Sequence, residues 1–183
     1  RGVAKRDHAF PENATPTVFA MTNPFTPPTL ESIGEGLSVI SVPDERWLHC
    51  DIKSISLLGN ILARQTAVEA GAIEAVLFRD GYLTEGASSN IWVVKDGKLL
   101  APPHDNLILE GIRYELMEEL ARRSGVPFEA RRISQDEVRN ADELLLTAAT
   151  KEVKPITRLD GQPVGKGVPG PIFHKLFAAY QEA

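Results

Sequence analysis

The spacing of apolar residues along the chain predicts both β-strands and helices. Apolar runs at 37–42 and 47–52 predict two strands separated by a turn at Pro43 and Asp44. Three Asp-Gly pairs predict tight turns between or within further strands. These further strands are expected at 75–78, 90–94, 98–101 and 143–147, followed by a hairpin over 156–164.

Helical spacing recurs in two longer stretches and at the end of the chain. Leu57, Leu58, Ile61 and Leu62 lie three or four residues apart, which predicts a helix that ends near Gly71. Further helices are expected over 111–123, from a cap at Ser134 through Arg139, and after the Gly- and Pro-rich connector 165–171. Because helices and hairpins interleave, we expect an α+β fold with a mixed sheet rather than a purely parallel one.

The first thirty residues differ from the rest of the chain. Residues 1–23 are loop-rich, and the stretch 23–29 holds three prolines, which predicts a connector rather than a regular element. The chain opens on Arg1 without an initiator Met, so we expect that an upstream piece is missing.

Composition excludes several classes of protein. A chain of 183 residues can bury one sizeable core, and its net charge of −5 argues against a nucleic-acid or anionic-membrane partner. No apolar run is long enough to span a bilayer. Cys50 is the only cysteine, so no internal disulfide can form, and a cytoplasmic location is predicted. No His, Cys and Asp residues have metal-ligand spacing, so no metal site is expected.

Lys53 directly follows the apolar run 47–52, so the strand prediction places it at the end of a buried strand. Removing an ammonium group from water costs free energy unless the group is paired or neutral. A lysine that burial keeps neutral becomes a nucleophile toward aldehydes. The alternative is a lysine at a strand end whose long side chain carries its charge into solvent.

Polar and small residues gather in three predicted loops. Glu85, Ser88 and Ser89 lie between two expected strands, where they could surround a polar ring or serve as ordinary turn residues. Gly111 precedes an expected helix, whose free backbone N–H groups suit a phosphate, although glycine before a helix is common. The loop 147–152 is rich in small residues, so its backbone could approach a ligand, or it is simply a close-packed turn.

Arg6 and His8 lie two positions apart near the start of the chain. In an extended segment, side chains at this spacing share one face. They could therefore grip a carboxylate together, or form an ordinary polar loop.

Four motifs together resemble the fold-type IV enzymes that depend on pyridoxal 5′-phosphate (PLP). They are DIKS at 51–54, TEGASSN at 84–90, LILEGI at 107–112 and TAATKEV at 147–153, in the order found in that family. The spacing from Lys53 to Glu85 is 85 − 53 = 32 residues, which also fits. Members include D-amino-acid, branched-chain and aryl (R)-amine aminotransferases and aminodeoxychorismate lyase. Residues 1–11, with Arg6 and His8, are most similar to the D-amino-acid aminotransferases.

The resemblance implies a role for each motif. Lys53 would form the Schiff base and move the proton between substrate Cα and cofactor C4′, and Glu85 would face the pyridine nitrogen. The implied cofactor-binding residues are Lys53, Glu85, Ser88, Ser89, Leu109, Gly111, Ile112, Arg113, Ala148 and Ala149. Leu109 would lie against the ring, while the backbone at 112–113 and 148–149 would hold the phosphate. Arg6 and His8 would bind the substrate carboxylate across a homodimer.

The resemblance also implies a domain arrangement and a reaction. Residues 1–30 would be the end of a small domain and its connector, and 31–183 a large PLP-binding pseudo-barrel domain, with the N-terminal small domain missing. The expected reaction converts D-alanine and 2-oxoglutarate to pyruvate and D-glutamate. The alternatives are a branched-chain L-amino-acid aminotransferase, an aminodeoxychorismate lyase, or a dimerising PLP-binding fragment that is catalytically incomplete.

The phosphate loops depart from the family pattern. Many relatives carry hydroxyl side chains there, where this chain has Arg113 and the pair Ala148 and Ala149. Backbone N–H groups are therefore expected to bind the phosphate, with Arg113 as an alternative source of charge.

Overall fold

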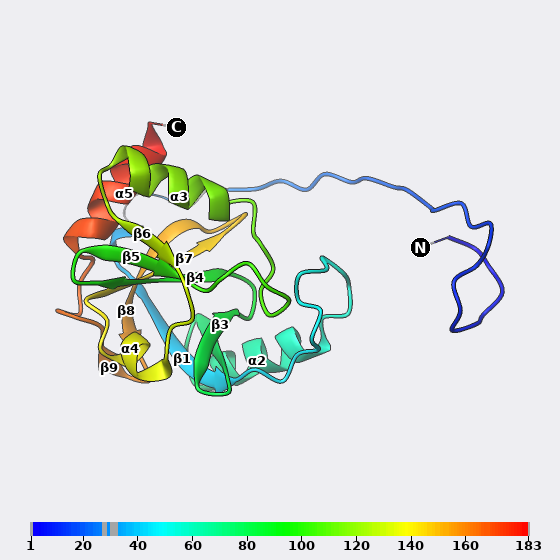
Figure 1. Ribbon diagram of the computed structural model, residues 1–183, viewed down its shortest axis with the longest axis horizontal. Helices are drawn as coiled ribbons and strands as arrows, with labels where there is room; N and C mark the ends of the chain where they lie inside the picture. The colour runs from blue at the N-terminus through cyan, green and yellow to red at the C-terminus, as the bar shows by residue number, and fades with distance from the viewer. Residues whose placement is uncertain (1, 27–28, 30–32, 183) are drawn as a thin grey trace.

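The computed structural model describes residues 2–26, 29 and 33–182, and Figure 1 shows a curled sheet covered by helices. The strands are β1 (Leu37–Pro43), β2 (Glu74–Arg79), β3 (Tyr82–Gly86), β4 (Asn90–Lys95), β5 (Lys98–Ala101), β6 (Phe128–Ala130), β7 (Glu143–Ala148), β8 (Glu152–Leu159) and β9 (Gln162–Pro163). The helices are α2 (Leu58–Glu69), α3 (Tyr114–Arg123), α4 (Gln135–Arg139) and α5 (Pro171–Gln181).

The strands of the described chain form one mixed sheet, as expected. Their order is β3-β2-β1-β8-β7-β4-β5-β6, and β9 pairs with β8. Strand β1 runs parallel to β2 and β8, and β5 parallel to β6, whereas the hairpin neighbours are antiparallel. The two edges of the sheet approach each other, because Leu83 N on β3 donates to the carbonyl of Ile133, shortly after β6, at 2.9 Å. The sheet is thus curled toward a barrel, which confirms the expected mixed fold.

The central strands are apolar on both faces because both faces are covered. On β4, Trp92 packs in the cluster with α3 and α5, while Ile91 packs in the cluster enclosed by the curled sheet. Successive side chains of a strand point to opposite faces, so neither face of β4 reaches solvent. Helix α2 covers a third, smaller cluster with β2, in which Ala67 and Leu77 are fully buried.

Most predicted elements are confirmed, and the Asp-Gly turns adopt the expected left-handed backbone at Asp80, Asp96 and Asp160. Ser134 caps α4 in a reciprocal pair with Glu137. The helix expected from residue 111 begins instead at Tyr114.

The strand expected at 47–52 is wrong. Backbone groups of this stretch bond to loops and turns: Cys50 N donates to Asn106 O at 2.9 Å, and Ile52 N to His49 O at 3.2 Å. The Asn106 side chain also donates to Leu48 O at 2.7 Å. A loop partner thus replaces a neighbouring strand, and Lys53 lies in an exposed loop rather than at the end of a buried strand.

Residues 2–26 form an extended segment that points away from the body of the molecule (Figure 1). An isolated bridge joins Gly2 to Pro16 within this segment. Part of the predicted connector, at 27–28, lies outside the described residues. The division into 1–30 and 31–183 stays a prediction.

Helix α5 begins on a buried carboxylate from β7. The two oxygens of Glu143 accept from the backbone N–H groups of Ile172 and Phe173, each at 2.8 Å. Glu143 is 8% exposed, so the anion faces the positive end of the helix with little screening by water.

Replacing Glu143 with Gln should destabilise the fold by about 1–2 kcal/mol, because the amide keeps the shape but loses the charge that the helix end stabilises. Urea unfolding of the variant measures this, with Glu118→Gln on the exposed side of α3 as the matched control. An unchanged midpoint for Glu143→Gln would show that the helix end needs no anion.

Candidate active site

A cavity of about 910 Å³ opens beside the sheet, where the four motif-bearing segments meet. Its walls are the loop between β1 and α2, the β3–β4 turn, the segment before α3 and the end of β7. All ten residues predicted to bind a cofactor line it: Lys53, Glu85, Ser88, Ser89, Leu109, Gly111, Ile112, Arg113, Ala148 and Ala149. Segments far apart in the sequence thus contribute to one hollow.

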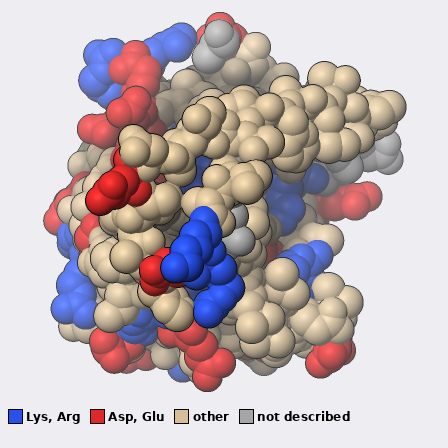
Figure 2. Space-filling view, turned by 90° about the vertical axis from the view of Figure 1, so that its right-hand side faces the viewer, with Lys and Arg blue, Asp and Glu red and all other residues tan. Residues whose placement is uncertain are grey.

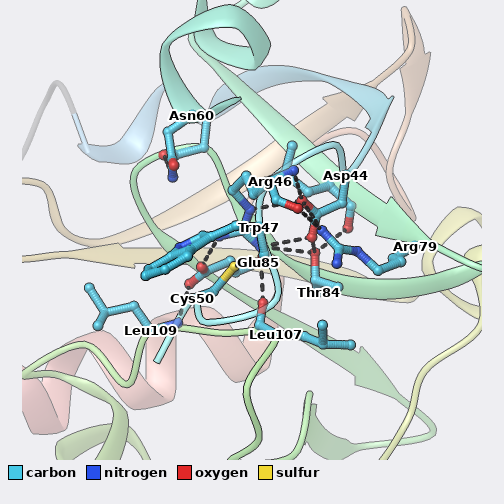
Figure 3. A network of polar contacts seen from close by, with 12 residues as sticks. Asp44, Arg46, Trp47, Cys50, Asn60, Arg79, Thr84, Glu85, Leu107 and Leu109 are labelled. Carbon is cyan, nitrogen blue, oxygen red and sulfur yellow. Dashed lines mark hydrogen bonds and ion pairs between the residues drawn. The ribbon is translucent and has the colours of Figure 1, made fainter. Parts of the chain in front are cut away.

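Glu85 is the buried acid of this cavity. It is 5% exposed near the end of β3, where its Oε2 accepts from Leu109 N at 3.1 Å and from Asn90 Nδ2 at 3.3 Å. Its Oε1 pairs with Nη1 of Arg46, as Figure 3 shows. The carboxylate is therefore held from both sides.

Arg46 connects Glu85 to a second buried acid, Asp44. The guanidinium bonds both Asp44 oxygens, with Nε at 2.9 Å from Oδ1 and Nη2 at 2.8 Å from Oδ2. Asp44 in turn accepts from Thr84 Oγ1 at 2.9 Å and pairs with Arg79 at 3.1 Å. Two carboxylates and two guanidinium groups thus alternate behind the cavity (Figure 3).

Burial and the charge of Arg46 act in opposite directions on the pKa of each acid, and the balance differs between the two. Burial raises the pKa of Glu85 to about 7, even though the charge and hydrogen bond of Arg46 oppose the rise. For Asp44, burial acts in the same upward direction, but the hydrogen bonds and charge of Arg46 outweigh it and lower the pKa to about 2. Glu85 is therefore the acid whose charge responds near neutral pH to what binds beside it.

The other cavity segments are fixed by close backbone contacts. A Cβ at position 111 would overlap Asn90 Oδ1, so any residue larger than glycine would require the Asn90 side chain to move. Asn90 Nδ2 also donates to Leu109 O at 2.8 Å, which fixes the backbone of the segment before α3. Tyr114 N then donates to Gly111 O at 2.8 Å in the turn that opens the helix.

Three predicted side chains bond within the protein. The hydroxyl groups of Ser88 and Ser89 both donate to Glu74, at 2.7 and 3.2 Å. The Arg113 guanidinium donates to Ala149 O at 3.0 Å and to the Tyr180 hydroxyl at 2.9 Å, so its charge is directed at the β7–β8 turn and α5. Backbone groups of these segments remain the expected phosphate ligands.

Arg6 and His8 lie apart from this cavity. Both are exposed in the extended N-terminal segment, and neither is among the described residues that line the hollow. The structure therefore does not bring them to the other predicted site residues of the same chain.

Sequence reasoning missed Arg46, Asp44 and Thr84. The sequence carried only a weak signal, namely that Asp44 and Arg46 are opposite charges two positions apart just after an expected strand. Asn60, which donates to Ala87 O at 2.9 Å and ties α2 to the β3–β4 turn, carried no recognisable signal.

Comparison with known proteins identifies the family. The model of the amino-transferase class IV family matches residues 1–159. The chain belongs to this family.

Among individual relatives, the D-alanine aminotransferase of Bacillus licheniformis is 43% identical over the whole chain, and that of Staphylococcus haemolyticus is 38% identical over 177 residues. The chain spans 64% and 62% of their lengths.

Solved structures of branched-chain aminotransferases share the fold. The match to the PLP form of the enzyme from Thermobaculum terrenum covers 80% of this chain and 50% of that enzyme's chain, with a TM-score of 0.74 and 30% identity. The match to the enzyme from Thermoproteus uzoniensis with norvaline covers 87% of this chain and 54% of that enzyme's chain, with a TM-score of 0.79 and 29% identity.

Within residues 2–26, 29 and 33–182, no cluster of three or more His, Cys, Asp or Glu side chains could hold a metal ion. No helix in the same ranges is long and apolar enough to cross a membrane.

Proposed function

We propose that this chain forms the cofactor-binding part of a PLP-dependent aminotransferase that acts on D-amino acids. The reaction would convert D-alanine and 2-oxoglutarate to pyruvate and D-glutamate. The observation that carries the proposal is that one cavity is lined by the buried Glu85–Arg46 pair, by Lys53, and by the backbone of the segment before α3 and of the end of β7.

The residues present fit PLP. Cavities for small ligands and cofactors are roughly 300–1,000 Å³, and this one, at about 910 Å³, leaves room for a substrate as well. A buried carboxylate at the cavity wall suits a protonated ring nitrogen, and the turn before α3 offers backbone N–H groups to a phosphate. When bound, PLP supplies an electron sink for negative charge at the substrate Cα.

The side chains divide the remaining work. Lys53 would attach the cofactor through its amine and, once released, move a proton from the substrate Cα. Glu85 would hold the proton on the ring nitrogen, and Arg46 keeps Glu85 in place. Leu109 would pack against the ring, while the backbone of 112–113 and 148–149 would bind the phosphate.

Substrate binding would need a second copy of the chain. Arg6 and His8 are exposed in the N-terminal segment, which extends away from the body of the molecule (Figure 1), so a homodimer is the arrangement in which they could reach a carboxylate. Large apolar side chains are exposed around the cavity and α2, including Leu48, Ile55 and Leu58 at 58%, 82% and 68%. Figure 2 shows a broad uncharged area on the side from which the N-terminal segment extends. A partner surface would cover such an area.

Two further properties follow from the same proposal. The partners would be a small amino acid and a 2-oxo acid. A cytoplasmic location suits an enzyme of central amino-acid chemistry with a single reduced cysteine, Cys50.

A branched-chain L-amino-acid aminotransferase is the second candidate, because the solved structures cited above carry that activity in their names. The identity of 43% to a D-alanine aminotransferase exceeds the 30% and 29% to those structures, which favours the first candidate.

The test is a transamination assay of the whole polypeptide in which this chain occurs. We expect turnover with D-alanine and 2-oxoglutarate, and little with L-alanine or L-leucine. Preference for L-leucine would move the protein to the branched-chain group. PLP binding without turnover of any amino acid would support the incomplete fragment instead.

A further inference from the structure

A further buried acid, Glu74, contacts two of the segments that border the cavity. Its side chain is fully buried at the start of β2, and its Oε2 accepts from Ser88 at 2.7 Å and Ser89 at 3.2 Å in the β3–β4 turn. The same oxygen accepts from Lys151 Nζ at 2.9 Å in the β7–β8 turn. One carboxylate oxygen thus joins the two turns. Their residues Ser88 and Lys151 are 63 positions apart in the sequence.

The β7–β8 turn needs such an anchor. Glu152 has a φ of +59°, a left-handed conformation that costs a non-glycine residue of order 1 kcal/mol or more. On one side Arg113 donates to Ala149 O at 3.0 Å, and on the other Lys151 reaches Glu74. The turn is therefore held at two points, through the carbonyl of Ala149 and the side chain of Lys151.

We propose that Glu74 and Lys151 are a positioning pair, which sets the β7–β8 turn so that its backbone N–H groups meet the phosphate of the cofactor. This inference rests on the proposed function, since it takes the turn as a phosphate site. In this chain the turn offers Ala148 and Ala149 rather than hydroxyl side chains, so affinity for the phosphate depends on where the backbone lies.

The ion pair is suited to this role. Burial alone would raise the pKa of Glu74, but the charge of Lys151 and the hydrogen bond from Ser88 lower it below its usual value. Glu74 is therefore an anion, and its charge is compensated by the turn itself. Removing Lys151 leaves a buried carboxylate without its cation, so the turn and the acid must rearrange together.

The experiment compares the affinities of the whole polypeptide for PLP and for pyridoxal, which lacks the phosphate. Lys151→Met keeps the length of the side chain but removes the charge, and Lys175→Met, at an exposed position of α5, is the matched control. We expect Lys151→Met to weaken PLP binding about tenfold, which corresponds to about 1.4 kcal/mol, and to leave pyridoxal binding unchanged. Amide exchange at 148–152 should also become faster in the cofactor-free variant, whereas exchange in α3 should not.

Glu74→Gln separates positioning from direct contact. If Lys151 merely bonded the phosphate itself, freeing it from Glu74 would leave PLP affinity equal or higher. A positioning pair predicts that Glu74→Gln weakens PLP binding in the same selective way, and that the double variant loses less than the sum of the single losses.

The outcomes are distinct. Equal losses for PLP and pyridoxal, or unchanged amide exchange in Lys151→Met, would overturn the positioning pair while leaving the proposed function intact. Failure of the parent protein to bind PLP at all would overturn the proposed function, and this inference with it.

Discussion

Replacing Lys53 with Ala is expected to lower the rate of transamination by about 10²- to 10⁴-fold, the range that general acid–base catalysis contributes. The reason is that no other amine is proposed to attach the cofactor and to move the proton from the substrate Cα. Treatment of the parent protein with borohydride should fix a phosphopyridoxyl group on the peptide that contains Lys53. The variant should bind PLP more weakly and retain no covalent label.

The exposed position of Lys53 makes this prediction informative. Burial in a strand cannot be the reason for its reactivity, since it lies in a loop at the cavity. Lys98→Ala is a suitable control, because Lys98 is partly exposed on β5 and pairs with Glu129. Label on Lys95, Lys98 or Lys151 in the parent protein would contradict the assignment.

The hydrophobic pattern predicted most elements because burial decides them locally. The run 143–147 is apolar through its centre, as suits a strand covered on both faces, and β7 is that strand. The run 47–52 has a similar mix of apolar residues, but its backbone partner is the loop around Asn106, and no local pattern reveals such a partner. The order of strands also depends on long-range pairing, such as that of β1 with β8.

Residues of the candidate site could be predicted from the sequence only where they belong to a recognisable motif. The motifs at 51–54 and 84–90 placed Lys53 and Glu85, and the structure brings both to one cavity. Arg46 could not be assigned a role in advance, because a charged residue after a strand is usually exposed. Arg46 is buried because it pairs with both Asp44 and Glu85. Asp44 directly follows β1 and Glu85 lies in β3, so the two acids come together only in the folded sheet.

Glu85→Gln is expected to slow transamination by roughly 10- to 10³-fold, because an opposite charge nearby typically shifts a pKa by 1–3 units, and the ring nitrogen would lose that support. PLP affinity should fall much less, since the phosphate contacts and the Lys53 attachment remain. Glu110→Gln is the matched control: Glu110 also lines the cavity, but its side chain is 46% exposed beside His104. A parental rate in Glu85→Gln would show that Glu85 does not support the ring nitrogen.

The same variant should change how stability depends on pH in the cofactor-free protein. Burial raises the pKa of Glu85 from 4.5 to about 7 in the folded state. Below pH 4.5 the acid is protonated whether the chain is folded or unfolded, and between 4.5 and 7 only the unfolded chain releases the proton. The free energy of unfolding should therefore fall as pH rises through this window, and then level off. Urea unfolding at several pH values should show this fall in the parent and its loss in Glu85→Gln. Bound PLP should also make this fall in the free energy of unfolding smaller in the parent, because a cationic ring nitrogen beside Glu85 lowers the pKa of the carboxyl group.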